Sequence, residues 1–266
     1  MSNNKLAKIM TIAGSDSGGG AGIQGDIKTI SALGGYATTA ITAITAQNTV
    51  GVKKILNIPI NMIEEQINAI VDDIGTDAIK IGMLSNEKII HCVVKIISTF
   101  KKKIPIVLDP VMVAKGGHKL LDIGAEKALI NELMPLCTII TPNIPEAEVI
   151  TGLKINNIND LETMGKSIIK MRIDNVLMKG GHLDSDILTD ILITRNSTEY
   201  FKSKKIITKN SHGTGCTLSS AIACGLGQQL SLKESINRAH KYVYKSILNA
   251  PNIGKGNGPL NHLIKV

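Results

Sequence analysis

Residues 210–220 read Asn210-Ser211-His212-Gly213-Thr214-Gly215-Cys216-Thr217-Leu218-Ser219-Ser220, a glycine turn that opens an apolar helical run. The first backbone N–H groups of a helix are unpaired, and with the helix dipole they form a site for an anion. Cys216 lies where this helix begins, so its thiol is expected to have a lowered pKa and to serve as a thiolate or a base. The alternative is a turn that only caps a helix and holds a small buried cysteine.

Around this stretch, strand and helix patterns alternate along almost the whole chain. Short apolar segments predict strands at residues 6–13, 36–45, 77–82, 104–108, 137–140 and 175–178, and an antiparallel pair at 187–194 and 199–201. Helical periodicity predicts helices at residues 23–33, 61–74, 86–100, 122–134, 158–171, 217–227 and 232–249. This alternation favours an α/β fold with a parallel sheet covered by helices on both faces. No linker or internal repeat is visible, so we expect a single domain over residues 1–266.

The composition predicts a sizeable aliphatic core, because 43% of the 266 residues are hydrophobic while only 2% are aromatic. The four cysteines, at 92, 137, 216 and 224, have no metal-binding spacing and favour reduced thiols in a cytoplasmic protein. Residues 1–5 lack the apolar segment of a signal peptide. The longest stretch without acids or bases, residues 29–52, is rich in Thr and broken by Gly34-Gly35, so no membrane partner is expected.

The net charge of +8 could indicate a nucleic-acid partner, but the basic residues are scattered. Only Lys101-Lys102-Lys103 forms a run, and no aromatic residues alternate with it for base stacking. A solvated lysine-rich surface is therefore favoured over nucleic-acid binding, and it would attract a phosphorylated small molecule. We expect a small-molecule substrate and a homodimer or a higher homo-oligomer.

Polar residues follow several of the predicted strands. These strand ends are Gly82-Met83, Asp109-Pro110, Thr141-Pro142-Asn143 and Lys179-Gly180-Gly181. In open α/β sheets, ligands bind beyond the carboxyl ends of the strands, so these residues are expected to converge on one cleft.

Oxygen ligands at two of these strand ends suggest a metal. Asp109 ends one strand, and Asn143 and Glu146 follow the next. Carboxylates suit Mg²⁺, which binds few protein groups and keeps waters and substrate phosphates as its other ligands. Equally, Asp109 and Asn143 could be turn and helix-cap residues. The isolated histidines at 118, 182 and 212 lie beside glycines and favour loop positions over metal ligation.

A glycine-rich loop follows the first predicted strand. Gly20, Gly22 and Gly25 match the dinucleotide-binding pattern, but no acid follows Asp26 until Glu64, where a ribose ligand would be needed sooner. A loop for close backbone approach to another ligand is favoured instead. Together with the anion site, the strand-end lysine and the carboxylates, it points to phosphoryl transfer.

The ordered motifs resemble the ribokinase-like superfamily and, within it, the hydroxymethylpyrimidine/phosphomethylpyrimidine kinases of thiamine biosynthesis. The resemblance covers nearly the whole chain and rests on the segments at residues 13–22, 47–49, 80–84, 108–112, 141–146, 179–182 and 212–216, with an approximate match at 254–262. It implies a three-layer α/β/α sandwich with a mostly parallel central sheet. It also implies ATP-dependent phosphorylation of 4-amino-5-hydroxymethyl-2-methylpyrimidine, and then of the monophosphate to the diphosphate.

The resemblance also assigns roles to residues. Cys216 stands where the superfamily usually has an aspartate base, and the amides of Gly213, Thr214, Gly215 and Cys216 form the anion hole. The implied pyrimidine-binding residues are Gln47, Asp26 and Met83. The implied Mg-ATP residues are Asp109 and Glu146 for the metal, with Asn143 and Lys179 for the nucleotide. The alternatives are a pyridoxal or pyridoxine kinase of the same superfamily, and a non-catalytic pyrimidine-binding protein.

Overall fold

The computed structural model describes residues 6–100, 103–113, 117, 120–122, 124–154, 157–181 and 186–264. Its strands are β1 (Lys8–Asp16), β2 (Tyr36–Asn48), β3 (Gly51–Asn57), β4 (Ala78–Ile81), β5 (Ile106–Leu108), β6 (Ile139–Ile140), β7 (Asn175–Met178), β8 (Ile187–Thr194) and β9 (Thr198–Lys204). Its α-helices are α1 (Gly22–Ala32), α2 (Ile60–Ala69), α3 (Glu87–Ile97), α4 (Ala125–Ala128), α5 (Ile144–Thr151), α6 (Ile158–Ile169), α7 (Thr214–Gly227) and α8 (Leu232–Leu248). His118 and His182, considered above, lie outside the described residues.

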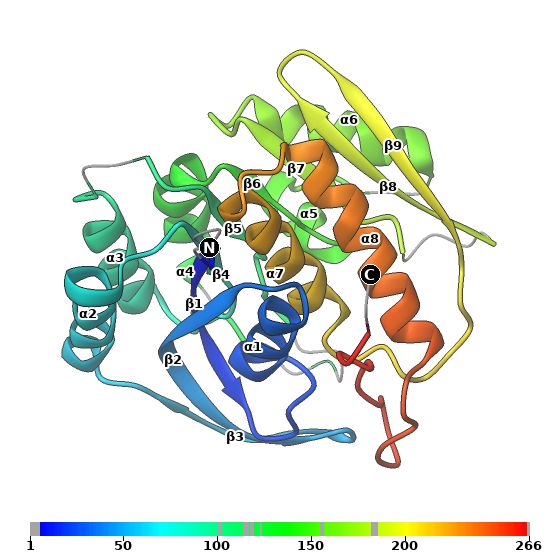
Figure 1. Ribbon diagram of the computed structural model, residues 1–266. Coiled ribbons are helices and arrows are strands. Elements are labelled where there is room, and N and C mark those ends of the chain that lie inside the picture. Colours follow the sequence, from blue (N-terminus) through cyan, green and yellow to red (C-terminus); the bar gives the residue numbers. More distant parts are fainter. Residues whose placement is uncertain are drawn as a thin grey trace, which may run out of the picture.

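The strands form one nine-stranded sheet in the order β3-β2-β1-β4-β5-β6-β7-β8-β9 (Figure 1). The six strands from β2 to β7 in this order are parallel to one another. The edge strands β3, β8 and β9 pair antiparallel. The mostly parallel sheet that the sequence predicts is therefore confirmed.

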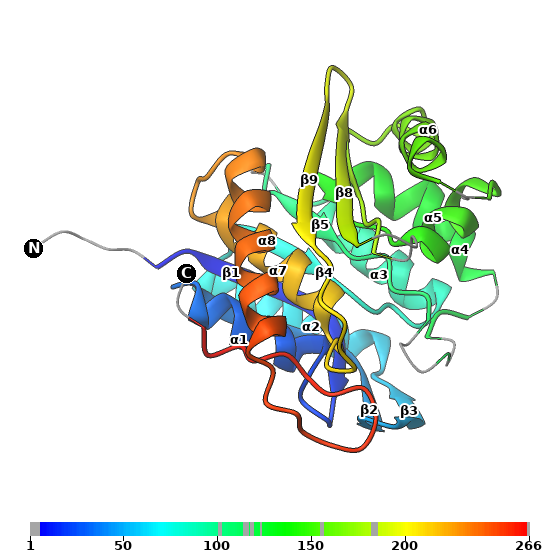
Figure 2. The ribbon, with the colours of Figure 1, turned by 90° about the vertical axis from the view of Figure 1, so that its right-hand side faces the viewer.

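Helices cover both faces of the sheet, as Figure 2 shows, with α1, α7 and α8 on one side and α3, α4, α5 and α6 on the other. Each face has its own aliphatic core: one includes Ile63 and Ile89, and the other Ile30 and Ile222. The expected three-layer α/β/α sandwich is thus confirmed. No helix in the described part of the chain is both long enough and apolar enough to span a membrane.

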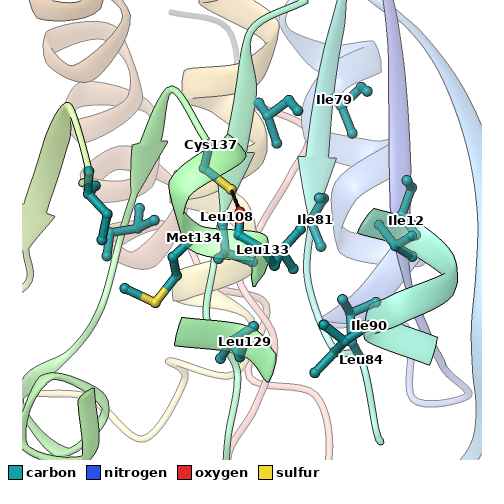
Figure 3. Packing of buried hydrophobic residues seen from close by; sticks show 14 of the residues in the cluster. Ile12, Ile79, Ile81, Leu84, Ile90, Leu108, Leu129, Leu133, Met134 and Cys137 are labelled. Carbon is teal, nitrogen blue, oxygen red and sulfur yellow. Dashed lines mark hydrogen bonds between the residues drawn. The ribbon is translucent and has the colours of Figure 1, made fainter. Parts of the chain in front are cut away.

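Strand periodicity decides which side chains reach each layer. Figure 3 shows Ile12, Ile79, Ile81 and Leu108 pointing from the sheet into the core beneath α3 and α4. Full burial of such a side chain stabilises the fold by about 1.5–3 kcal/mol. Successive strand residues alternate between faces, so the neighbours of these residues point to the opposite layer. Those neighbours include Thr11 within β1, Lys80 in β4 and Asp109 directly after β5, all buried and polar. The α7 side of the sheet therefore carries a polar layer near the strand ends.

Some elements differ from the sequence prediction. Strand β2 continues to Asn48, and an unpredicted hairpin turn, in which Asn48 Oδ1 accepts the Val50 N–H at 2.9 Å, leads into β3. The unpredicted α5 has Asn143 as its N-cap. The helix predicted at 61–74 ends as α2 at Ala69, and a wider π-helical turn, Ile70–Ile74, completes it. The helix predicted at 122–134 is α4 followed by a π-helical turn, Leu129–Leu133, and a 3₁₀ turn, Met134–Leu136.

Candidate active site

Lys179 lies between two carboxylates at the carboxyl ends of the parallel strands. Its Nζ is 2.9 Å from Asp109 Oδ1 and 3.9 Å from Glu146 Oε2. Burial alone would lower the pKa of Lys179, but the charges of Asp109 and Glu146 outweigh burial and raise it. Lys179 is therefore a permanent cation. The predicted convergence of these strand ends is present in the structure.

Glu146 also takes part in capping the N-terminus of α5. Its Oε2 accepts the Asn143 N–H at 2.8 Å, while Asn143 Oδ1 accepts the Glu146 N–H at 2.9 Å, forming a capping box. Asn143 is thus the helix cap that the sequence offered as an alternative. Burial, followed by the nearby Asp109 charge, raises the pKa of Glu146 to about 7 despite the opposing effect of Lys179. A second cation beside Asp109 and Glu146 would lower that pKa.

The glycine turn before α7 lies directly against the glycine-rich loop that follows β1. Gly213 has φ +87° and is the residue that caps the helix N-terminus. A Cβ on Gly213 would lie 1.8 Å from the Gly20 carbonyl oxygen, so only glycine fits there. Gly215 lies over Asp109 and Lys179, because its Cβ would be 3.1 Å from Asp109 Oδ2 and 3.3 Å from Lys179 Nζ. The helix N-terminus therefore faces the same cations and carboxylates.

Cys216, the third residue of α7, has a raised pKa, so the lowered pKa predicted from its position is wrong. Burial is the largest cause, and the carboxylates of Asp26 and Asp109 add to it. The Lys80 cation and the Gly22 backbone amide act in the opposite direction but leave the pKa at about 11. The thiol is therefore protonated at neutral pH in the ligand-free protein. Like the other three cysteines it is free, but it is the one whose residue is partly exposed.

Asp26 is completely buried beside this thiol. Its Oδ2 lies 2.9 Å from Lys80 Nζ and accepts the Thr11 hydroxyl at 2.6 Å, while its Oδ1 accepts the Ser220 hydroxyl at 2.7 Å. Its oxygens are thus already occupied by internal partners. The structure gives Asp26 the part of a buried counter-ion for Lys80, and a contact with the pyrimidine stays a prediction.

The other two predicted substrate residues lie near the glycine-rich first loop. Gln47, at the end of β2, has its Nε2 3.3 Å from His212 Nε2. Met83 is buried, and its sulfur would lie 3.0 Å from a Cβ on Gly14. Gln47 therefore lies beside the loop that follows β1, where its N–H donates to the Ser17 hydroxyl at 2.8 Å, and Met83 lies against Gly14 within β1.

His212 and Asp16 form a pair that the sequence analysis missed. His212 Nε2 lies 2.8 Å from Asp16 Oδ2, and that oxygen also accepts the Ala21 N–H at 2.9 Å. Burial would raise the pKa of Asp16, but His212 and the loop amides outweigh burial and lower it. His212 was interpreted as an isolated loop residue because its partner is distant in sequence. The available signal was the position of Asp16, an acidic residue shortly after the apolar segment predicted as a strand at residues 6–13.

The C-terminal segment joins two loops of the site. The Asn257 N–H donates to the Thr49 carbonyl at 2.8 Å, and the His212 N–H donates to the Gly258 carbonyl at 3.1 Å. A Cβ on Gly256 would lie 2.1 Å from the Thr49 carbonyl oxygen. In Figure 2 the red C-terminal segment runs past β2 and β3 accordingly. It thus ties the β2–β3 turn to the turn that precedes α7.

Residues 16–261 match the family model described as phosphomethylpyrimidine kinase. The chain belongs to the phosphomethylpyrimidine kinase family. This kinase has the ribokinase-like α/β fold that the motifs suggested.

Relatives and solved structures agree with the family. The kinase is 42% identical to the hydroxymethylpyrimidine/phosphomethylpyrimidine kinase of Haemophilus influenzae, over 98% of each chain. It is 43% identical to the thiamine biosynthesis bifunctional protein ThiED of Geobacter sulfurreducens over 96% of its own length, and it spans 52% of that longer protein. An ADP complex of Bacillus subtilis pyridoxal kinase superposes with a TM-score of 0.90, at 35% identity over 97% of this chain and 98% of the other.

Together, the kinase site has two ends joined by the stretch from His212 to Gly215. His212 contacts Gln47 and Asp16 at one end. Gly215 approaches Asp109 and Lys179 at the other. The helix N-terminus and Cys216 follow directly, so one short segment connects the Asp16–His212 pair to Asp109 and Lys179.

Proposed function

We propose that this kinase transfers a phosphoryl group from ATP to the hydroxymethyl oxygen of 4-amino-5-hydroxymethyl-2-methylpyrimidine and then phosphorylates the monophosphate to the diphosphate. The observation that carries the proposal is the approach of Gly215 to Asp109 and Lys179, at 3.1 and 3.3 Å from its Cβ position. That approach aims the first amides of α7 at the place where Lys179 would hold transferred phosphate. An N-terminal amide cradle beside a fixed cation is what phosphoryl transfer requires.

Each residue has a distinct task in this proposal. The amides of Gly213, Thr214, Gly215 and Cys216 hold the transferring group as its charge spreads, and Lys179 offsets that charge. Gln47 offers both a donor and an acceptor to the aminopyrimidine edge, with Met83 covering an apolar part of the ring. Cys216 accepts the hydroxyl proton. Because Asp109 helps to raise the pKa of Cys216, offsetting the Asp109 charge lowers that pKa and increases the fraction of Cys216 in the thiolate form that can accept a proton.

The residues present fit a bound Mg²⁺. Asp109 and Glu146 supply oxygen donors, and their mutual repulsion is visible in the raised pKa of Glu146. No cluster of three or more His, Cys, Asp and Glu side chains suited to a metal exists among the residues the structure describes. That agrees with an ion which takes few protein ligands and completes its shell with water and phosphate oxygens. Bound there, Mg²⁺ would neutralise charge on ATP; Asn143 would support it by fixing Glu146.

A second candidate is pyridoxal as the acceptor. The likeness to the Bacillus subtilis pyridoxal kinase supports it, at a TM-score of 0.90. The same donor and acceptor of Gln47 would serve a pyridine ring less completely, because pyridoxal lacks the exocyclic amine. A non-catalytic binding role is not favoured by a site that holds both a cation and an amide cradle. We further expect one kinase domain over residues 1–266, a homodimer or higher homo-oligomer, and a cytoplasmic location.

A substrate panel tests the proposal. The full chain is incubated with Mg-ATP and, separately, the hydroxymethylpyrimidine, its monophosphate, pyridoxal and pyridoxine, and the products are identified by mass. We expect mono- and diphosphate from the pyrimidine and the highest kcat/KM for it. Higher kcat/KM for pyridoxal would replace the substrate in the proposal, and no product from any acceptor would support the binding protein.

A further inference from the structure

Next to the Lys179–Gly180 turn lies a carboxylate that no step above uses. Asp190 of β8 is 5% exposed, and its Oδ1 accepts the Gly180 N–H at 2.9 Å. Its charge also interacts with that of Lys179. Asp190 therefore bonds to the peptide that directly follows the phosphate-side lysine.

The backbone around Lys179 is held on both sides. The Lys179 N–H donates to the Pro142 carbonyl at 2.9 Å, and the next N–H, of Gly180, donates to Asp190. A Cβ on Gly180 would lie 2.0 Å from the Thr189 carbonyl oxygen, so this turn lies directly against β8. The direction in which the Lys179 side chain leaves the sheet is consequently fixed by these two bonds.

Asp190 also lies against the last helix. His240 of α8 has its Nε2 3.3 Å from Asp190 Oδ2, and its ring stacks on Phe201 of β9 with centroids 5.4 Å apart. The His240 side chain is only 16% exposed. Burial lowers the pKa of His240, although Asp190 opposes the effect. The neutral imidazole therefore packs between Phe201 and the Asp190 carboxylate, close to the carboxylate but without a hydrogen bond to it.

We propose that Asp190 and His240 are a positioning pair that holds the Lys179–Gly180 turn, and with it the Lys179 ammonium group, in place for phosphoryl transfer. The inference rests on the proposed function for the role of Lys179. Neither residue faces Asp109, Glu146 or Cys216 through any described hydrogen bond, so the pair acts through the turn. Displacements of about 1 Å at such a group can cost on the order of 100-fold in rate.

Steady-state kinetics on purified full-length variants test the pair. Asp190→Ala removes the acceptor for Gly180, and we expect kcat to fall about tenfold with KM for the pyrimidine unchanged. Asp190→Asn keeps an oxygen acceptor without the charge, and we expect kcat within about twofold of the wild type. His240→Leu removes the polar partner of Asp190 but keeps an apolar side chain, and we expect about a threefold fall in kcat. His91→Gln removes an exposed histidine that lies 3.1 Å from Glu132, and it serves as the matched control with unchanged kinetics.

Two further measurements separate positioning from folding and from substrate identity. Amide hydrogen exchange at Gly180 should be fast in Asp190→Ala and slow in the wild type and Asp190→Asn. The affinity for ADP, measured by calorimetry, is followed in every variant, so the pair can be judged even if the wild type phosphorylates no pyrimidine. In that case a weaker ADP affinity in Asp190→Ala, restored in Asp190→Asn, supports the pair while the proposed function fails. Equal kcat and ADP affinity in Asp190→Ala and wild type, or equal losses in Ala and Asn, would overturn it.

Discussion

The Lys80 ammonium group lies 2.9 Å from the Asp26 carboxylate, and neither side chain has any exposed surface. Both groups also act on the pKa of Cys216, Lys80 lowering it and Asp26 raising it. The lysine is thus a poor activator of the thiol, because a carboxylate of opposite effect accompanies it. Burial is the main reason that this cysteine at a helix start holds its proton, and Asp26 offsets part of the opposing effect of Lys80.

Asp26→Asn should destabilise the protein by about 3–5 kcal/mol, because it leaves the Lys80 charge buried without a counter-ion. It should also lower the pKa of Cys216. Urea unfolding and the pH dependence of iodoacetamide labelling measure the two effects. The control is Lys95→Ala, which breaks a pair with Glu64 in which the lysine side chain is 74% exposed, and which should cost less than about 1 kcal/mol. An unchanged thiol pKa in Asp26→Asn would separate Asp26 from the chemistry of Cys216.

Cys216→Ser should lower kcat about 10²–10⁴-fold while ATP binding stays close to normal, because it removes the base and keeps the α7 amides. In the ligand-free wild type, labelling of Cys216 should be slow at pH 7 and should accelerate about tenfold per unit toward its pKa of about 11. Labelled peptides identified by mass give the site; Cys216 should precede the buried Cys92, Cys137 and Cys224. A serine variant with near wild-type kcat would return the thiol to a packing role.

Alanine substitutions of Gly213 and Gly215 should have different effects, one on stability and the other on activity. Gly213→Ala places a side chain at φ +87° and 1.8 Å from the Gly20 carbonyl, so it should lower the unfolding free energy by at least about 1–3 kcal/mol. Gly215→Ala avoids that backbone strain but points its methyl at Asp109 and Lys179, so it should keep its stability and lose about tenfold in kcat. Thermal melts beside kinetics distinguish them. Full activity in Gly215→Ala would show that the close approach is unnecessary.

Glu146 should make stability depend on pH. Its pKa is raised to about 7 in the folded protein, so the folded state binds more protons than the unfolded state between about pH 4.5 and 7. The stability from this group is complete below pH 4.5 and is lost as the pH rises through 7. Relative to Glu146→Gln, the wild type should therefore lose on the order of 3 kcal/mol across that window.

The same Glu146→Gln variant should need more Mg²⁺ for half-maximal rate, since a carboxylate near Asp109 is lost. Unfolding curves at several pH values and a Mg²⁺ titration of the rate provide the two readouts. Parallel pH profiles of stability, with an unchanged Mg²⁺ titration, would leave Glu146 only its capping bond to Asn143.

Gln47→Leu should weaken pyrimidine binding by about 1–3 kcal/mol, because polar edges of the ring are left unpaired. The measurement is KM for the pyrimidine at saturating ATP. Thr198→Val, on the distant β9, is the control for the loss of a polar group and should not change KM. Equal pyrimidine KM in Gln47→Leu and wild type would remove Gln47 from substrate recognition.

The ends of the predicted strands made part of this site predictable. The rule that ligands bind at the carboxyl ends of the strands placed Asp109 and Lys179 in one cleft. The sequence also offered Asn143 as a helix cap, although α5 itself was not predicted; Glu146, three residues later, completes the capping box. A sequence pattern of this kind predicts which face of a helix or strand is buried and where that element ends.

Contacts between loops could not be predicted from such patterns. The Asp16–His212 pair joins residues 196 positions apart, and neither loop has a periodicity that aims its side chains. The pKa of Cys216 was predicted wrongly because the helix dipole is a local effect, whereas Asp26 and Asp109 act from α1 and β5. Desolvation and neighbouring carboxylates outweigh a helix terminus when the group is enclosed.

The strap formed by residues 256–258 has a consequence for biosynthesis. The Gly256 N–H bonds to the Thr49 hydroxyl across 207 positions of the chain, so the hairpin that carries Gln47 is translated long before its tether. At about 5–20 residues per second, the ribosome takes on the order of 10–40 s to make that interval. In a nascent chain, β1 can already pair with β2 while the β2–β3 turn is not yet bonded to the C-terminal segment. The kinase would then become active in one late step, after this C-terminal segment has been synthesised.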